Sequence, residues 1–95
     1  MVKHIVMWKF RPGTEAEADR FLTALATLRD EIAVIRSMEV GRSAREGNDC
    51  DAVLTVTFDS FADLDTYRTD PRHLAVSALC KAIRTERHAV DILLP

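Results

Sequence analysis

Residues 2–10 read Val-Lys-His-Ile-Val-Met-Trp-Lys-Phe, and their β-branched and aromatic side chains predict a strand over residues 3–10. The even positions of this strand are His4, Val6, Trp8 and Phe10, whereas the odd positions are Lys3, Ile5, Met7 and Lys9. A sheet with one face in water alternates apolar and polar side chains along each strand. Here the middle of the strand is apolar on both faces, so the pattern predicts a sheet that is covered on both sides.

Outward from this strand, helical and extended segments alternate along the chain. Arg11-Pro12-Gly13 ends the strand, and Thr14 with Glu17 predicts a capping box that opens a helix running to about Ala33. The spacing of its apolar residues predicts one buried face, made of Ala18, Phe21, Leu22, Leu25, Leu28 and Ile32. Further strands are predicted at about residues 35–42, 52–58 and 87–94, with a polar turn over residues 43–50.

The second helical segment is predicted in two pieces. Ser60 opens the first piece as an N-cap, with Phe61 and Leu64 facing inward. The second piece is expected to turn inward the residues Leu74, Ala78, Leu79 and Ile83.

The break between the two pieces falls at Asp70-Pro71. Asp70 is a favourable N-cap, and Pro71 suits the first helical position because its missing N–H would be unpaired there anyway. The break places Tyr67 just before the second piece and His73 in its first turn. Two side chains able to exchange protons are therefore held by local chain geometry.

The element order is β-α-β-β-α-β, which predicts a ferredoxin-like α+β fold with an antiparallel sheet and both helices on one face. A chain of 95 residues has room for one core, so we expect a single domain over residues 1–95. The helices can cover only one face of the sheet. The economical cover for the other apolar face is a second copy of the chain, which predicts a homodimer with facing sheets.

The composition restricts the classes of partner. Hydrophobic residues make up 47% and charged residues 29% of the chain, which is typical of a folded protein. A net charge of -2 argues against nucleic acid or an anionic membrane as the main partner. Residues 1–10 lack the features of a signal peptide, and no apolar run approaches the length needed to span a bilayer, so a cytoplasmic location is expected.

The cysteines and histidines match no metal or redox motif. Cys50 and Cys80 are far apart, and Cys80 lies on an apolar helical stripe where a small buried side chain is expected. The spacing of His4, His73 and His88 fits no set of metal ligands. We therefore expect no metal, and because the chain also has no phosphate-binding glycine loop, we expect no cofactor.

Three parts of the chain together resemble the stress-responsive A/B barrel (Dabb) family. They are residues 2–10, residues 57–60 followed by Tyr67 and residues 70–73, and the closing Val90-Asp91. The resemblance covers essentially the whole chain, and its specificity lies in the spacing of the three segments. It implies a ferredoxin-like protomer that pairs into a dimeric α+β barrel.

The best understood enzymes among these relatives are plant polyketide cyclases of the olivetolic acid cyclase type. They close a linear polyketide by intramolecular aldol chemistry without a metal or organic cofactor. The resemblance implies active-site roles for His73 and Tyr67, with His4 and Asp91 close by.

The chain also departs from those cyclases. Leu22 and Leu25 occupy the region where the cyclase places pocket-lining aromatic residues, and Arg84 and Glu86 lie where the cyclase is bulky and apolar. These departures argue against a polyketide substrate, although not against a cavity.

His73 and Tyr67 are the candidate catalytic residues. An imidazole with a pKa of ~6.5 can accept a proton from an activated carbon at neutral pH, and a tyrosine hydroxyl can donate a hydrogen bond to the enolate oxygen that forms. The alternative for His73 is a structural hydrogen bond near the helix N-terminus. The alternative for Tyr67 is a ring packed on the sheet edge with its hydroxyl in water.

Candidate substrate-binding residues are His4, Val6, Trp8 and Asp91. The first three share one face of the first strand, and His4 could orient a substrate or be an ordinary hydrogen-bonded buried histidine. Asp91 interrupts an apolar strand, and a buried carboxylate needs a partner. That partner is either a histidine whose tautomer Asp91 fixes, or a backbone group or arginine.

Two classes of function follow. The first is a homodimer that binds a small organic molecule in an apolar cavity between sheet and helices, where cofactor-independent proton transfer or cyclisation takes place. The second is a non-catalytic, stress-associated dimer in which the histidines and tyrosine fill the barrel mouth. A cofactor-free monooxygenase-like enzyme, with Trp8 shaping the pocket, is a further alternative.

Overall fold

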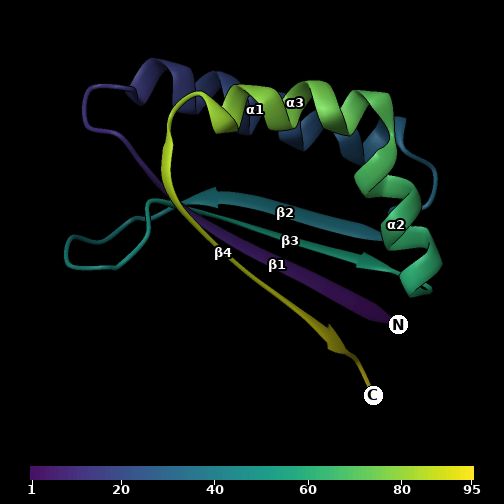
Figure 1. Ribbon diagram of the computed structural model, residues 1–95. Helices are drawn as coiled ribbons and strands as arrows, with labels where there is room; N and C mark the ends of the chain where they lie inside the picture. The colour runs from purple at the N-terminus through teal and green to yellow at the C-terminus, as the bar shows by residue number, and fades with distance from the viewer.

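A computed structural model describes residues 1–95 as three helices on one side of a four-stranded antiparallel sheet (Figure 1). The elements are β1 (Val2–Phe10), α1 (Glu15–Glu31), β2 (Ser37–Arg42), β3 (Ala52–Phe58), α2 (Phe61–Thr69), α3 (Pro71–Lys81) and β4 (Arg84–Leu93). The strand order is β2-β3-β1-β4, which with this element order is the predicted ferredoxin-like arrangement. None of the helices has the length and apolar character required to cross a membrane.

Helix α1 runs beside α3 above the sheet, and α2 lies at the end of the sheet near the N-terminus (Figure 1). The predicted inner face of α1 is confirmed, since all six of its apolar residues from Ala18 to Ile32 are buried. The prediction of a capping box at its start is wrong. The Thr14 hydroxyl donates to the Arg11 carbonyl oxygen at 2.6 Å and makes no cap bond, because the Thr14 backbone is not extended as an N-cap requires.

The inward faces of α2 and α3 differ in part from the expectation. Ser60 caps α2 by accepting from the Asp63 N–H at 3.2 Å, and Leu64 is buried as predicted. Phe61, the first residue of α2, is instead half exposed.

In α3 the predicted stripe faces outward. Leu74, Ala78 and Leu79 are exposed, whereas Val76 and Cys80 are buried and Ile83 is buried just beyond the helix. Leu74 with Ala78 and Val76 with Cys80 both keep a helical spacing of four. Spacing alone therefore could not choose between these two faces, and packing against α1 selects the second.

Strand β4 begins earlier than predicted, at Arg84 rather than Arg87. The extra residues pair with the end of β1, where the register shifts between Lys9 and Phe10 so that Phe10 lies opposite Arg84. Strand β2 begins at Ser37, because Ile35 is tied into the turn after α1 by a bond from its N–H to the Ile32 carbonyl. Arg84 and its neighbours thereby become part of the sheet that lies beneath the helices.

The two faces of the sheet have different surroundings. The even residues of β1 lie beneath the helices and are buried, whereas the odd residues lie on the open face, where Met7 is 41% exposed. The register places Ile5 opposite Val90, which is 52% exposed, and Met7 opposite Val53. The open face therefore carries a central apolar patch, as the sequence predicted. A contiguous exposed patch of this kind is typical of an interaction surface.

Candidate functional site

A small cavity of about 50 Å³ lies between the helices and the helix-facing side of the sheet. Its walls include five of the six predicted site residues, namely His4, Val6, Trp8, Tyr67 and His73. The sixth, Asp91, does not line the cavity but contacts it through His4. Larger surface hollows, such as one of about 480 Å³ beside Lys9 and Arg42, contain none of these histidines and are mostly polar. The cavity is therefore the place where the candidate chemistry converges.

The pair of His4 and Asp91 is produced by the register of β1 and β4, which sets the two residues directly opposite each other. The His4 ring is buried, and its Nδ1 lies 2.5 Å from Asp91 Oδ1. A carboxylate only accepts, so Nδ1 carries the proton and a neutral His4 keeps its lone pair on Nε2. Two kinds of partner were predicted for Asp91, and the structure shows the first, a histidine whose tautomer the carboxylate fixes. The Asp91 side chain is 33% exposed rather than fully buried.

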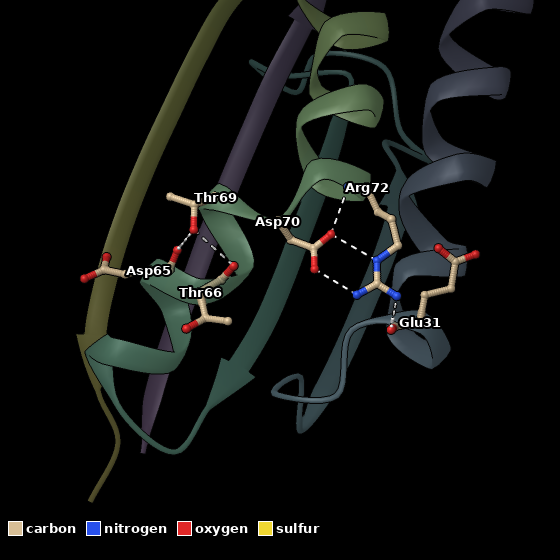
Figure 2. Close-up of polar contacts among 6 residues, drawn as sticks. All are labelled: Glu31, Asp65, Thr66, Thr69, Asp70 and Arg72. Atoms are coloured by element: carbon tan, nitrogen blue, oxygen red, sulfur yellow. Dashed lines mark hydrogen bonds and ion pairs between the residues drawn. The ribbon is translucent and has the colours of Figure 1, made fainter.

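The junction between α2 and α3 is held by Asp70 and Arg72 (Figure 2). Asp70 Oδ1 accepts from the Arg72 N–H at 2.8 Å, which confirms the predicted N-cap, and Pro71 occupies the first turn. The Arg72 guanidinium donates to both Asp70 oxygens, at 3.0 and 2.8 Å, and to the Glu31 carbonyl oxygen at 2.6 Å. These hydrogen bonds from Arg72 lower the pKa of Asp70 to about 2. The same guanidinium ties the junction to the end of α1.

Thr69 completes the junction by closing the end of α2. Its hydroxyl donates to the Asp65 carbonyl oxygen at 2.9 Å and lies 3.4 Å from that of Thr66 (Figure 2). The sequence predicted the cap by Asp70 but not the fork of Arg72, because the Glu31 carbonyl is 41 residues away in the chain. Hydrogen bonds therefore fix both the end of α2, which carries Tyr67, and the start of α3, which carries His73.

Tyr67 is completely buried, and its hydroxyl has no hydrogen-bond partner. Its ring packs against Phe58 and His73, with ring centroids 5.3 and 4.4 Å away. Burial raises the pKa of Tyr67 well above its usual value, so the hydroxyl keeps its proton and remains a donor. The alternative of a hydroxyl in water is wrong, because the ring lies under α2 rather than at an open edge. An unpartnered buried hydroxyl costs roughly 1–3 kcal/mol, so a group that receives its hydrogen bond would be stabilised.

His73 is half-buried in the first turn of α3. Its Nδ1 lies 3.2 Å from the Arg68 carbonyl oxygen, which only accepts, so Nδ1 carries the proton and Nε2 keeps the lone pair. Burial lowers the pKa of His73 below its usual 6.5, although the bond to Arg68 opposes the shift. His73 is therefore neutral at pH 7. The structural hydrogen bond considered for His73 does form, and it leaves a nitrogen free for proton transfer.

The remaining groups at the cavity restrict its chemistry. Burial raises the pKa of the Cys80 thiol to about 11, so Cys80 is a neutral, unreactive wall residue. No group of three potential metal-binding side chains converges anywhere in the structure. Arg84 and Arg87 also line the cavity, and the sequence analysis did not single them out as ligand-binding. Arg87 shares a face with Asp91, four residues further along β4, and that spacing could have found it, whereas Arg84 reaches the same face only through the register shift at the end of β1.

The arrangement thus combines one hydroxyl donor with two imidazoles, each of which donates from Nδ1 to an oxygen acceptor. Val6 and Trp8 supply apolar walls, which strengthen electrostatic interactions within the cavity. Such a set can remove a proton from a bound molecule and stabilise the oxyanion that results.

Comparisons with known proteins agree on the family and the fold. The model of the stress responsive A/B barrel domain (Dabb) matches residues 2–93. The chain is similar to a dimeric protein of unknown function with a ferredoxin-like fold from Bacteroides fragilis, with 31% identity, coverage of 98% of this chain and 95% of that one, and a TM-score of 0.91.

Two further solved structures share the fold at lower identity. A dimeric ferredoxin-like protein from Thermobifida fusca has 23% identity, coverage of 98% and 90%, and a TM-score of 0.87. A hydroxynitrile lyase from Passiflora edulis has 14% identity, coverage of 99% and 93%, and a TM-score of 0.86. Among curated proteins no match was found. The chain belongs to the stress responsive A/B barrel domain (Dabb) family.

Proposed function

We propose that this protein is a homodimer in which each protomer binds a small organic molecule and catalyses cofactor-independent proton transfer on it. The observation that carries the proposal is the Tyr67 hydroxyl, which is buried without a partner in the same cavity as His4 and His73. A donor left unpaired in a folded protein is costly, and a bound oxygen atom would remove that cost. The site is thus suited to a molecule that presents an oxygen to Tyr67.

In the proposed reaction, His73 is the base and Tyr67 the oxyanion donor. His73 Nε2 takes a proton from a carbon beside a carbonyl group as that C–H bond breaks, and the electron pair moves onto the carbonyl oxygen. The resulting enolate oxygen accepts a hydrogen bond from Tyr67. The protonated His73 then returns a proton to carbon, or the enolate attacks a second carbonyl group in a cyclisation. His4, held by Asp91, orients the substrate.

The size of the cavity indicates a small substrate. A volume of about 50 Å³ holds a few water molecules, whereas sites for drug-sized ligands have volumes of roughly 300–1,000 Å³. We therefore propose a molecule of a few heavy atoms rather than a polyketide. The same small volume favours the alternative function, a non-catalytic dimer with a filled interior.

The chemistry is tested by deuterium exchange at the methyl group of pyruvamide, a small neutral ketone, followed by NMR in heavy water. We expect the protein to accelerate exchange over buffer and His73→Ala to abolish the acceleration. His88→Ala is the matched control, since His88 is exposed, bonded to Glu86 and outside the cavity. Exchange no faster than in buffer, or equal in wild type and His73→Ala, would favour the non-catalytic alternative.

The dimer is proposed from the apolar patch on the open face and from the Bacteroides relative, which is described as dimeric at 31% identity. Ile5→Glu introduces a charge at the centre of the patch, opposite Val90, and should convert the dimer to a monomer. Leu74→Glu is the control, because it removes an exposed apolar side chain from the outer face of α3. Native mass spectrometry measures the oligomeric state of the wild type and of both variants. A monomeric wild type would exclude the dimer.

A further inference from the structure

The edge of the cavity carries positive charge that the nearby acidic side chains offset only in part. Arg84 and Arg87, from the start of β4, line the cavity, and Arg68 at the end of α2 is close enough to act on Arg87 electrostatically. The ion pairs of the structure are formed by Arg36, Arg42, Arg72, His4 and His88, and none includes these arginines. Two guanidinium groups therefore line the cavity, with a third nearby, and none of the three forms an ion pair.

The sheet register explains how two of them reach the site. Arg87 lies opposite Trp8 and Arg84 opposite Phe10, so both belong to the face of β4 that continues the helix-covered face of β1. Arg84 is half-buried and Arg87 is exposed, so both side chains reach solvent at the edge of the cavity. Positive charges close to one another destabilise each other's charged forms. Burial and the charges of Arg84 and Arg68 lower the pKa of Arg87.

The nearby acidic groups offset only part of this charge. Asp91 is the closest carboxylate and is engaged by His4 Nδ1 at 2.5 Å. The Cys80 thiol lies among the lining residues but stays protonated at neutral pH, since burial raises its pKa to about 11. A second group in the cavity also lacks a partner, namely the buried Tyr67 hydroxyl. Two kinds of donor at the same cavity therefore lack an oxygen partner, namely the arginines that form no ion pair and the Tyr67 hydroxyl that forms no hydrogen bond.

We infer that the substrate is a small carboxylate, a short oxo acid whose carboxylate is held by Arg87 and Arg84 while its carbonyl oxygen accepts from Tyr67. The planar guanidinium donates two parallel hydrogen bonds that match a carboxylate. This inference rests on the proposed function, which supplies the proton-transfer reaction. It adds that the substrate is negatively charged.

Pyruvate and pyruvamide provide the test, because they have the same number of heavy atoms and differ in charge. Binding to the full protein is measured by chemical-shift titration at low salt. One charge-assisted hydrogen bond contributes roughly 1.5–3 kcal/mol, so we expect pyruvate to bind at least about tenfold more tightly than pyruvamide. The preference should shrink as salt is added. Arg87→Gln should remove most of the preference, because it weakens pyruvate binding far more than pyruvamide binding.

Lys81→Gln is the matched control, because it removes an exposed positive charge at the end of α3 that does not line the cavity. Arg84→Gln is a second test of the same preference and covers the case in which Arg87→Gln does not fold. Equal affinity for the two compounds, or a preference that survives both arginine substitutions, would overturn the inference. Inorganic phosphate binding more tightly than pyruvate would overturn it as well, since the site would then be a phosphate site.

Failure of this inference and failure of the proposed function give different results. A preference for pyruvate without any methyl exchange in either compound keeps the carboxylate site and rejects the proton-transfer reaction. Methyl exchange in pyruvamide without a preference for pyruvate keeps the reaction and rejects the carboxylate site. Wild-type protein that binds neither compound rejects the carboxylate site.

Discussion

The junction of α2 with α3 and the pair of strands β1 and β4 supply the two halves of the candidate site in different ways. At the junction, Tyr67 and His73 lie within one short stretch of chain and are oriented by the caps between them. In the strand pair, His4 and Asp91 are 87 residues apart and meet only because the sheet register sets them opposite each other. The first half depends on local chemistry and the second on long-range pairing.

Proton-transfer groups that line one cavity are therefore held in place by two different kinds of structure, local helix caps and long-range strand pairing. A change at the junction should alter Tyr67 and His73 without moving His4, and a change in β4 should do the reverse. In both halves an oxygen acceptor fixes the histidine tautomer, which is the carboxylate of Asp91 for His4 and the Arg68 carbonyl for His73. Substitutions in each half, together with the pH dependence, should distinguish the contribution of the junction from that of the strand pair.

The largest effect is expected from removing the base at the junction. His73→Ala should lower the rate of methyl exchange in pyruvamide by roughly 10²–10⁴-fold, which is the usual contribution of general base catalysis. His4→Ala should have a smaller effect, because His4 only orients the substrate. Exchange rates measured by NMR for both variants decide the comparison. A larger loss in His4→Ala would move the base from the junction to the strand pair.

Tyr67→Phe should lower the exchange rate by roughly 10²–10³-fold, because it removes the donor to the enolate oxygen. It should also raise the free energy of unfolding by about 1 kcal/mol, since the buried hydroxyl without a partner disappears. Urea unfolding and NMR exchange measure the two effects. A less stable variant would show that the hydroxyl has a partner in the native protein, which would weaken the argument for a ligand.

In the strand pair, Asp91→Asn should reduce the exchange rate by up to about 10²-fold, the scale of a misplaced catalytic group. The asparagine amide can donate to His4 Nδ1 and so favour the opposite tautomer. Nitrogen NMR of the histidine rings should show that change at His4 and leave His73 as it was. An altered His73 ring would mean that the two halves are coupled.

The pH dependence should report His73. Its folded pKa is lowered below 6.5, so the unfolded chain binds the proton more readily and folding stability falls as pH drops below that value. The exchange rate should likewise hold at pH 7 and fall only below 6.5, as His73 becomes protonated. NMR titration of the ring measures the midpoint. A His73 midpoint at or above the usual value would contradict its burial.

The smallest effect is expected from the cap of the junction. Asp70→Ala should lower the Tm by a few degrees, because α3 loses its N-cap and Arg72 its partner. The folded pKa of Asp70 is lowered from 3.8 to about 2, so its contribution is present above pH 3.8 and is lost as pH falls to about 2.

Thermal unfolding at several pH values checks this prediction for the cap. Asp65→Ala is the control, since Asp65 is an exposed residue of α2 that contributes only its backbone carbonyl to the junction (Figure 2). Equal midpoints for the two variants would show that the Asp70 cap does not stabilise the junction.

Much of the fold could be predicted because its signals are local. The inner face of α1, the break at Asp70-Pro71 and the apolar open face of β1 all follow from periodicity and capping within a few residues. The predicted inner face of α3 was wrong for Leu74, Ala78 and Leu79, because the apolar residues fit two helical faces equally well, whereas Cys80 and Ile83 are buried as predicted. The capping box at Thr14 was wrong because its hydroxyl turned back to the Arg11 carbonyl instead.

Of the candidate site, the sequence indicated the residue types and the approximate place of Tyr67 and His73. It left the partner of Asp91 open, since a strand pattern does not state which residue of a neighbouring strand lies opposite. It did not single out Arg84 and Arg87 as a ligand-binding pair, because β4 was predicted to begin three residues too late for Arg84. The roles of all these residues in catalysis stay predictions until the experiments above are made.

The sequence by itself determined the order of the helices and strands, the two apolar faces of β1 and the break that separates Tyr67 from His73. These features depend on side-chain periodicity and on backbone hydrogen bonds between near neighbours, which a single stretch of chain contains in full. Only the tertiary structure decided that His4 meets Asp91, that Tyr67 loses its hydrogen-bond partner and that Arg84 and Arg87 reach the cavity. Each of those depends on sheet register and helix packing, which join residues whose separation along the chain carries no signal of their contact.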